Sequence, residues 1–233
     1  MIKEISIKIP RWIRYLRNKV YVSMFCSKDK YSDVFHNIYN SNYWGSTESI
    51  SGIGSSLVQT SVIRREIPSL LKEIGVRSML DVPCGDFNWM RETNIDIDRY
   101  IGADLISELV VKNQQRYGSR NKEFITLDII KDDIPQVDII MCRDCLIHFS
   151  FEHIILTLRN FKRSKSTYLL TTTYTDRLKN HDIVTGGWRP INLQLYPFNF
   201  PEYIKLINEK CTEAKGKYYD KSLALWKIDD III

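Results

Sequence analysis

Apolar residues follow two recurring patterns between residues 56 and 173. Short unbroken apolar runs are typical of strands that a parallel sheet buries on both faces. Apolar positions three and four residues apart are typical of amphipathic helices. The runs predict strands over residues 77–83, 100–105, 124–128, 137–142 and 167–173. The helical spacing predicts helices over residues 56–75, 107–117 and 151–161, with a helical turn over 87–92.

Polar residues mark where some of these helices begin. Ser56 and Gln59 have the S-x-x-Q spacing of a capping box. Ser150 stands where it can cap the helix that follows it. Residues 31–55 are rich in Ser, Asn, Gly and Tyr, which favours irregular structure there.

The alternation of strands and helices predicts an α/β fold with a doubly wound, mainly parallel sheet. Near the end of the chain, we expect a helix over residues 202–207 and a strand over 222–228. With 233 residues, 44% of them hydrophobic, the chain is long enough for one domain with a substantial core. Because ligands of such sheets bind beyond the carboxyl ends of the strands, the residues that end strands are the first candidates for a site.

The net charge of +5 is concentrated at the start of the chain. Residues 1–30 hold eight lysine or arginine residues and two acidic residues, so the rest of the chain is close to neutral. We therefore expect a basic N-terminal helical arm over residues 1–40, with its helix at 10–24, and a domain over 41–233. Since enzymes that act on nucleic acids usually have basic groups around the site, we expect no nucleic-acid partner. Three roles stay open for the arm: docking on the domain, contact with an anionic membrane surface or a biosynthetic enzyme, or a lid over an anionic substrate.

The cysteines and the lack of sorting signals indicate a cytoplasmic protein, with the inner face of the membrane as the place where the arm would act. Five cysteines are an odd number, and charged residues interrupt the apolar positions at the start of the chain. No apolar run approaches the roughly 18 residues of a membrane span. Cys142 and Cys145 form a C-x-x-C pair without a second pair at zinc-ligand spacing, so we predict reduced thiols and no metal site.

Three acidic residues stand at the ends of successive expected strands. Asp81 ends the first, Asp104 the second and Asp128 the third, around the single Gly85. Each of them alone is explained as readily by a helix cap as by a cofactor site. Asp104 follows Asp81 at the spacing at which an acid accepts hydrogen bonds from a ribose. The set of three therefore predicts a site for a nucleoside-like cofactor.

The loop after the first strand distinguishes between cofactors. A dinucleotide needs several glycines so that the backbone can approach its pyrophosphate. Here Pro83 and Phe87 flank Gly85, and the carboxylates of Asp81 and Asp86 would repel a pyrophosphate. Acids suit a cofactor with an ammonium and a sulfonium group, which is S-adenosylmethionine (SAM).

These residues resemble a known family. The segment DVPCGD at 81–86 is similar to the first motif of class I SAM-dependent methyltransferases, D-x-G-x-G-x-G, and keeps its middle glycine. Between residues 35 and 228 the chain resembles a bacterial branch of that class found with capsule and O-antigen biosynthesis, including the methyl phosphoramidate decoration of capsules. The segments that carry this resemblance are WG at 44–45, SGIGSS at 51–56, residues 81–89, CRDCLIH at 142–148, LLTTT at 169–173 and GGWRPINLQ at 186–194.

The resemblance implies a Rossmann-like sheet of seven strands, with helices on both faces and an antiparallel hairpin of the last strands. It implies that Asp81 and the Cys84–Gly85 backbone serve the methionine part of SAM, Asp104 the ribose and the Asp128 region the adenine. The other cofactor-binding residues that it implies are Trp44, Ser51, Gly52 and Ser55, which would close over the cofactor, and Pro83, Trp89 and Arg143.

The residues after the fourth strand are candidates for the chemistry. A sugar hydroxyl barely ionises at neutral pH, so its methylation benefits from a general base, and His148 is our candidate. The alternative is a histidine satisfied by packing or by the helix start. Asp144 is placed to orient that histidine or to bind SAM, and Arg143 to bind SAM or a substrate phosphate. His181 is a second candidate base.

The segment 187–194 is the candidate substrate site, and an ordinary rim loop is the alternative. An aromatic ring beside fan-like donors is typical of a carbohydrate or phosphosugar site. The expected substrate-binding residues are Trp188, Arg189, Asn192, Gln194 and His181. The predicted protein is a SAM-dependent methyltransferase of a small-molecule or glycan acceptor, most simply an oxygen of a surface polysaccharide. A non-catalytic SAM-fold protein that binds a glycan-biosynthesis enzyme, a methyltransferase of another small molecule and a nicotinamide oxidoreductase are its rivals.

Overall fold

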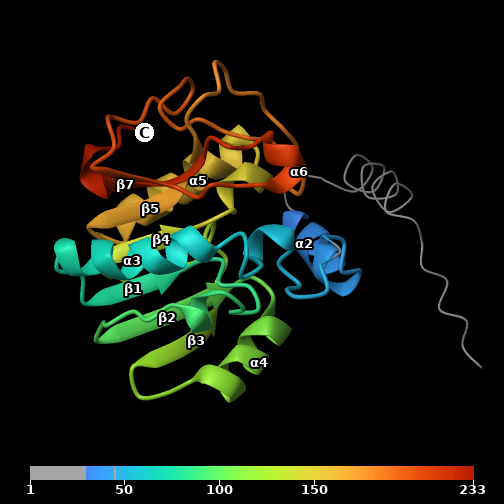
Figure 1. Ribbon diagram of the computed structural model, residues 1–233, viewed down its shortest axis with the longest axis vertical. Coiled ribbons are helices and arrows are strands. Elements are labelled where there is room, and N and C mark those ends of the chain that lie inside the picture. The colour runs from blue at the N-terminus through green and yellow to red at the C-terminus, as the bar shows by residue number, and fades with distance from the viewer. Residues whose placement is uncertain (1–29, 45) are drawn as a thin grey trace, which may run out of the picture.

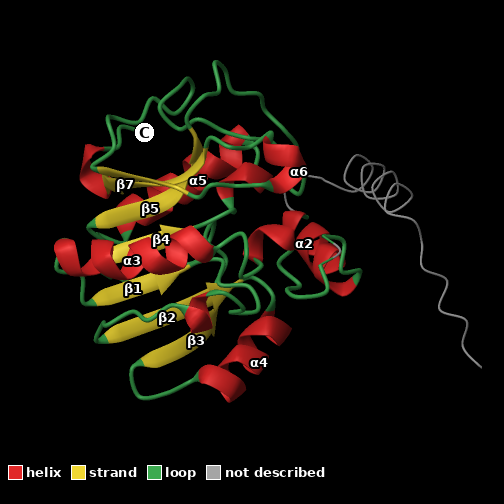
Figure 2. Cartoon of the chain, viewed as in Figure 1, coloured by secondary structure: helices red, strands yellow, loops and turns green. Residues whose placement is uncertain are grey.

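A computed structural model describes residues 30–44 and 46–233, and the predicted helix at 10–24 lies outside these residues (Figure 1). The chain folds around one seven-stranded sheet with strand order β3-β2-β1-β4-β5-β7-β6 (Figure 2). The strands are β1 Ser78–Asp81, β2 Arg99–Asp104, β3 Lys122–Thr126, β4 Ile139–Cys142, β5 Tyr168–Tyr174, β6 Lys205–Asn208 and β7 Lys221–Lys227.

The first five strands run parallel and the last two do not. β1 pairs in parallel with β2 and β4, β2 with β3, and β4 with β5. β7 is antiparallel to β5, and β6 is antiparallel to β7. This confirms the predicted sheet and its terminal hairpin. The order of strands reverses between β1 and β4, which is where a doubly wound sheet binds its ligand.

Helices cover both faces of the sheet, as predicted. Neighbouring residues of a strand point to opposite faces, so Met79 packs in the cluster that contains α3, and Leu80 packs in the cluster that contains α5. The helices are α2 Tyr31–Asn40, α3 Ser61–Glu73, α4 Ser107–Tyr117, α5 Phe151–Arg163 and α6 Glu213–Gly216, with short 3-10 turns at Ile53–Ser55, Met90–Glu92, Leu146–His148 and Ile228–Asp230.

One predicted cap is present and the other differs. The Ser150 side chain accepts a hydrogen bond from the His153 amide at 3.2 Å, so α5 begins where the sequence indicated. The Gln59 amide donates to the Ser56 hydroxyl at 3.4 Å, but α3 begins only at Ser61. The Gln59 side chain donates instead to Thr212 at 2.8 Å, so the capping box is replaced by a tie between two distant segments.

Two predicted elements are wrong. Residues 31–40 are not irregular, because α2 buries Tyr31, Val34 and Ile38 along one face at helical spacing. Residues 202–207 are not a helix, because β6 forms there and pairs with β7, with Lys205 opposite Leu225. The first segment has a helical apolar spacing, and the second forms a strand through its pairing with β7.

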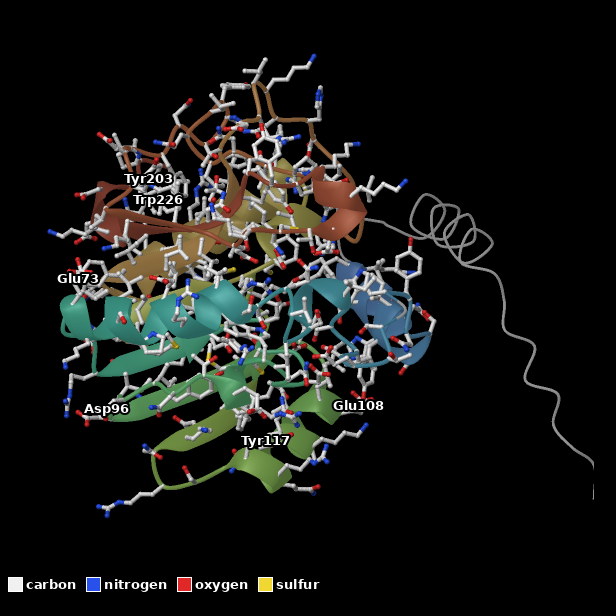
Figure 3. All side chains as sticks on the ribbon, in the orientation of Figure 1. Glu73, Asp96, Glu108, Tyr117, Tyr203 and Trp226 are labelled. Atoms are coloured by element: carbon white, nitrogen blue, oxygen red, sulfur yellow. The ribbon has the colours of Figure 1, made fainter. Side chains whose placement is uncertain are left out.

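The connection between β5 and β6, residues 175–204, contains neither helix nor strand although every one of its residues is described. It is nevertheless anchored in the core, because Phe200 packs against Trp226 of β7 at 5.1 Å between ring centroids. Tyr203, just before β6, contacts the same indole ring, and the two side chains lie together in Figure 3. Across residues 30–44 and 46–233, every helix is too short or too polar to cross a membrane.

Candidate active site

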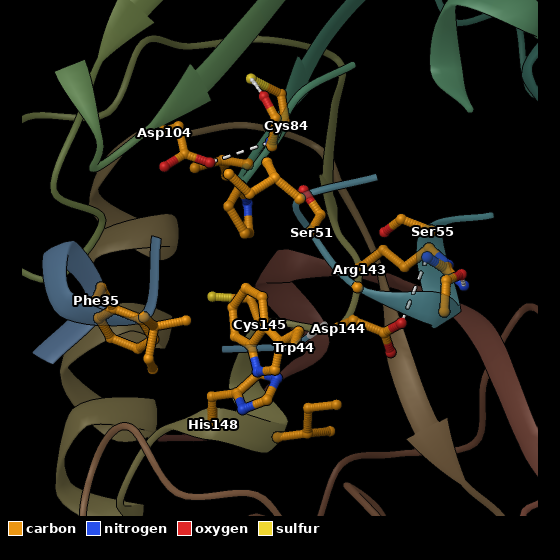
Figure 4. Close-up of a pocket in the computed structure, with 18 of the residues that line it drawn as sticks. Phe35, Trp44, Ser51, Ser55, Cys84, Asp104, Arg143, Asp144, Cys145 and His148 are labelled. Carbon is orange, nitrogen blue, oxygen red and sulfur yellow. Dashed lines mark hydrogen bonds and ion pairs between the residues drawn. The ribbon is translucent and has the colours of Figure 1, made fainter. Parts of the chain in front are cut away.

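A cavity of about 410 Å³ opens at the carboxyl ends of β1, β2 and β4, where the strand order reverses (Figure 4). Its wall brings together the strand-end acids, the loop after β1, residues 143–149 after β4, and α2. On the other side lies the segment of residues 46–57, which we call the cover loop. Predicted cofactor-binding residues that line the cavity are Trp44, Ser51, Gly52, Ser55, Asp81, Pro83, Cys84, Gly85, Trp89, Asp104, Asp128 and Arg143.

Gly85 shapes the loop after β1. Its φ of 56° lies in the left-handed region, which favours glycine. Its amide donates to Asp104 Oδ2 at 3.1 Å, and its carbonyl accepts from Asn113 Nδ2 at 2.8 Å. A Cβ atom at this position would stand 2.1 Å from Ser51 Oγ. A side chain here would therefore collide with the cover loop.

Hydrogen bonds dock the cover loop on the loop after β1. The Asp86 carboxylate accepts from Ser49 Oγ at 2.9 Å and from the Ile50 amide at 3.0 Å. Asn88 Nδ2 donates to Glu48 at 3.1 Å and to the Ser55 carbonyl at 3.1 Å. Asp86, which looked like a repulsive charge in the sequence, thus holds the cover loop in place.

Asp81 and Asp104 are buried carboxyls at the ends of neighbouring strands. The Tyr100 hydroxyl donates to Asp81 Oδ2 at 2.5 Å, and burial raises the pKa of Asp81 to about 7. Asp104 accepts from the Ile106 amide at 2.9 Å, and burial raises its pKa to about 6. Both carboxyls therefore lack a cationic partner strong enough to offset their desolvation.

Asp128 lies two residues beyond the end of β3 and also lines the cavity. The Tyr31 hydroxyl of α2 donates to its Oδ2 at 2.5 Å, and the Ile130 amide donates to its Oδ1 at 3.0 Å. Sequence reasoning missed Tyr31, because it read this segment as irregular. The helical spacing of Tyr31, Val34 and Ile38 was the signal that could have found it.

His148 is fixed in one tautomer. Its Nδ1 lies 2.8 Å from the carbonyl oxygen of Gly187, and since a carbonyl only accepts, Nδ1 donates. Nε2 therefore carries the lone pair. Burial lowers the pKa of His148, so the ring is neutral at neutral pH. The Trp44 ring lies beside it, with ring centroids 5.3 Å apart and planes tilted by 40°, and Figure 4 shows both on the opposite side of the cavity from Asp104.

Three buried charged side chains and a part-buried one form a cluster next to His148, which we call the charge cluster: Arg143, Glu209, Lys221 and the part-buried Asp144. Arg143 donates to both oxygens of Glu209, at 3.1 and 2.7 Å. Lys221 Nζ lies 2.6 Å from Asp144 Oδ2 and 3.4 Å from Glu209. Burial alone would raise the pKa of Asp144, but Lys221 and Arg143 lower it to about 2.

The charge cluster changes the roles expected for Arg143 and Asp144. The hydrogen bond that orients His148 comes from Gly187, whereas Asp144 is bound by Lys221 and Thr172. Arg143 is committed to Glu209 and to the Gly54 carbonyl, to which it donates at 2.9 Å. The guanidinium therefore links the end of β4 to the cover loop, and its donors are not available to bind a phosphate.

Of the residues expected to bind substrate, Trp188 lines the cavity. Arg189 is buried and donates to the carbonyls of Leu146 and Phe149 at 2.8 and 2.7 Å. Its guanidinium braces the turn that presents His148, which is the physical reason that it does not face substrate.

The remaining three expectations also differ. Asn192 is buried and donates to the Thr175 carbonyl at 3.2 Å. Gln194 donates to the Pro201 carbonyl at 3.4 Å, and His181 is exposed and gives its carbonyl to Arg189. The side chains of Asn192 and Gln194 satisfy backbone carbonyls of a connection that has no strand or helix to do so. The sequence missed the residues that line this end of the cavity instead: Tyr174, Cys211, Glu213, Tyr218 and Lys221.

Comparison with known proteins gives the class of fold. No family model and no curated protein matches the sequence. PigF with S-adenosylhomocysteine (SAH) is a similar solved structure: 14% identity, 93% of this chain and 69% of that chain covered, TM-score 0.59. The N1-methyltransferase of 1,6-didemethyltoxoflavin from Burkholderia thailandensis, solved with that compound and SAH, gives 12% identity, 87% and 91% coverage and a TM-score of 0.58. The methyltransferase domain of bacterial CtHen1-C gives 12% identity, 74% and 98% coverage and a TM-score of 0.54.

The chain therefore has the fold of class I SAM-dependent methyltransferases. The likeness is one of fold.

Proposed function

We propose that the protein is a SAM-dependent methyltransferase that methylates an oxygen of a sugar, or of a decoration, in a bacterial surface polysaccharide. The observation that carries this proposal is the neutral His148, with Nε2 free of the contact that binds Nδ1, in a cavity edged by strand-end acids. The fold supports the methyltransferase part of this proposal, and the resemblance of the sequence motifs supports the polysaccharide acceptor.

The acidic end of the cavity fits a cationic nucleoside cofactor. Burial raises the pKa values of Asp81 and Asp104, so a positively charged ligand beside them would stabilise their ionised forms. Asp104 would hold ribose hydroxyls, Asp81 the ammonium side and the Asp128 region the adenine. When bound, SAM supplies a methyl group already activated by its sulfonium.

The chain's own task is to position the acceptor and to take its proton. Holding two reactants in the right geometry is worth up to roughly 7–11 kcal/mol of the barrier. As the new C–O bond forms and the methyl–sulfur bond breaks, His148 Nε2 would take the hydroxyl proton. The Gly187 carbonyl then stabilises the imidazolium through Nδ1. The proton leaves to solvent after the products separate.

Calorimetric titration with SAH and NAD tests the cofactor. We expect SAH to bind, NAD not to bind, and Asp104→Asn to weaken SAH by about tenfold or more through the loss of charge-assisted hydrogen bonds. Asp96→Asn is the matched control, because Asp96 is exposed before β2 and is not among the residues that line the cavity. A folded protein that binds NAD and not SAH contradicts the proposal. SAH binding without methyl transfer to any glycan would instead favour a non-catalytic SAM-fold protein or a methyltransferase of another small molecule.

A further inference from the structure

We propose that the end of the cavity beside β5 and β7 binds an uncharged sugar ring, and that a ring bearing a phosphate is rejected there. This rests on the proposed function and narrows its acceptor. Three aromatic side chains, which we call the aromatic triad, form this end together with Glu213: Tyr174, Trp188 and Tyr218.

The aromatic triad comes from three separate segments. Tyr174 ends β5, Trp188 lies in the β5–β6 connection, and Tyr218 precedes β7. The Trp188 and Tyr218 ring centroids are 4.9 Å apart at 64°, and Tyr174 meets them edge-on at 6.4 and 6.0 Å. Trp188 is 42% exposed, so its ring is accessible from the cavity. Such a surface offers an apolar face on which the C–H groups of a sugar ring can pack.

The charge on this end disfavours an anion. Both cations that line it are already neutralised, since Arg143 binds Glu209 at 2.7 Å and Lys221 binds Asp144 at 2.6 Å. A phosphate would have to displace Glu209 or Asp144 from one of these pairs, and the displaced carboxylate would be left without its cationic partner in a buried or part-buried position, which is energetically costly. An acceptor with a phosphate on its reacting ring would meet that cost.

The cavity as a whole adds to the same effect. Among the described residues that line it, six acidic side chains face two cationic ones, and His148 is neutral. Even after a cationic cofactor has bound, carboxylates remain in excess. The electrostatic potential of the cavity therefore repels anionic acceptors and leaves neutral ones unaffected.

Glu213 gives the site its polar contact. Its Oε1 lies close to Gly54 of the cover loop. A Cβ atom added to Gly54 would be 3.2 Å from this oxygen. Its neighbour Cys211 contacts the same oxygen at 3.9 Å, which is a weak thiol hydrogen bond. A carboxylate is an acceptor only, with up to four lone-pair sites, so Glu213 suits the hydroxyl groups of a sugar. An aromatic face with a hydrogen-bond acceptor beside it is a site for a polyol ring.

Binding to the SAH-saturated protein tests the proposal without requiring turnover. The probes are methyl glycosides of common hexoses and 6-deoxyhexoses, each paired with the phosphate of the same sugar, in ligand-observed NMR and calorimetry. We expect at least one glycoside to bind and its phosphate to bind at least tenfold more weakly. Trp188→Ala should weaken the glycoside by about tenfold, in line with aromatic contacts worth about 1 kcal/mol or more, and leave SAH affinity unchanged.

Two further variants separate recognition from folding. Tyr196→Ala is the matched aromatic control in the same connection, because Tyr196 is 80% exposed, and glycoside binding should not change. Glu213→Gln keeps the shape of the side chain. It should weaken glycoside binding and reduce the ratio of glycoside affinity to sugar-phosphate affinity. Equal or tighter binding of the phosphates, or no glycoside binding in a protein that binds SAH, overturns the proposal. Loss of SAH binding itself would count against the proposed function instead.

Discussion

The tautomer of His148 depends on a single backbone contact. Gly187 belongs to the β5–β6 connection, and its carbonyl leaves Nε2 as the free lone pair. The connection is held in turn by Arg189, which donates to carbonyls on both sides of His148. Arg189, which the sequence marked for substrate, thus positions His148.

Replacing the histidine tests its role at the scale of one residue. We expect His148→Gln to lower kcat by about 10²–10⁴-fold, as is usual for the loss of a general base, with SAH affinity unchanged. Because burial lowers the pKa of His148, activity of the wild type should fall only when the pH drops below about 6.5. Steady-state kinetics across pH, with an acceptor that the wild type uses, would show this limb and its absence in the variant. A variant that keeps wild-type kcat would remove His148 from the chemistry.

At the scale of elements, the contact between the cover loop and the loop after β1 is tight. Gly85 has a left-handed φ and faces Ser51 Oγ. Gly85→Ala therefore costs about 1 kcal/mol in backbone strain and adds a collision with the cover loop. We expect SAH affinity to fall sharply, by calorimetry, in a protein that still unfolds cooperatively.

A second substitution distinguishes the two causes. Ser51→Gly removes the atom that would collide, so the double variant should recover part of the SAH affinity that Gly85→Ala loses. Additive effects of the two substitutions would mean that the backbone, and not the packing of the cover loop, sets the loss.

Elements with strong local signals could be predicted from the sequence. The helix expected at 107–117 coincides with α4, and Ser150 caps α5 as expected. The sequence predicts a helix at the position of β6, because the four residues of β6 acquire strand structure only by pairing with β7. The secondary structure of such a short segment depends on what it pairs with, and its six residues alone do not show the partner.

The candidate site was predicted where residues end strands and missed where distant segments meet. Asp81 and Asp104 follow from strand ends in register. Glu209 and Lys221 complete the charge cluster from 66 and 77 residues away, so no spacing links them to Arg143 and Asp144. The donors of Arg189 could equally serve substrate or backbone, and only the fold shows that they serve backbone.

At the scale of the whole molecule, two buried carboxyls couple stability to pH. Asp81 and Asp104 have pKa values of about 7 and 6 in the folded protein, against 3.8 as their ordinary value. Between these values the folded state holds protons that the unfolded state has released. The stabilisation is complete below about pH 4 and is lost as the pH rises through 6 and 7.

We therefore expect the free energy of unfolding of the ligand-free protein to decrease from pH 5 to pH 8. His148, whose pKa is lowered, contributes in the opposite direction, so the difference from Asp81→Asn isolates the carboxyl. Urea denaturation of the two proteins at several pH values is the measurement, and the variant should show the smaller decrease. Equal slopes would mean that Asp81 is ionised in the folded protein.

The β5–β6 connection has a practical consequence for engineering. Ile191, Leu193, Phe198 and Phe200 anchor it in the core, while Leu178, Val184 and Tyr196 stand out into solvent. A library that keeps the anchors and varies Trp188, which lines the cavity, would change acceptor preference while sparing the strand ends, and the exposed positions would tolerate substitution without changing it. New specificities are therefore best sought in this one stretch of thirty residues, 175–204, on an otherwise unaltered scaffold.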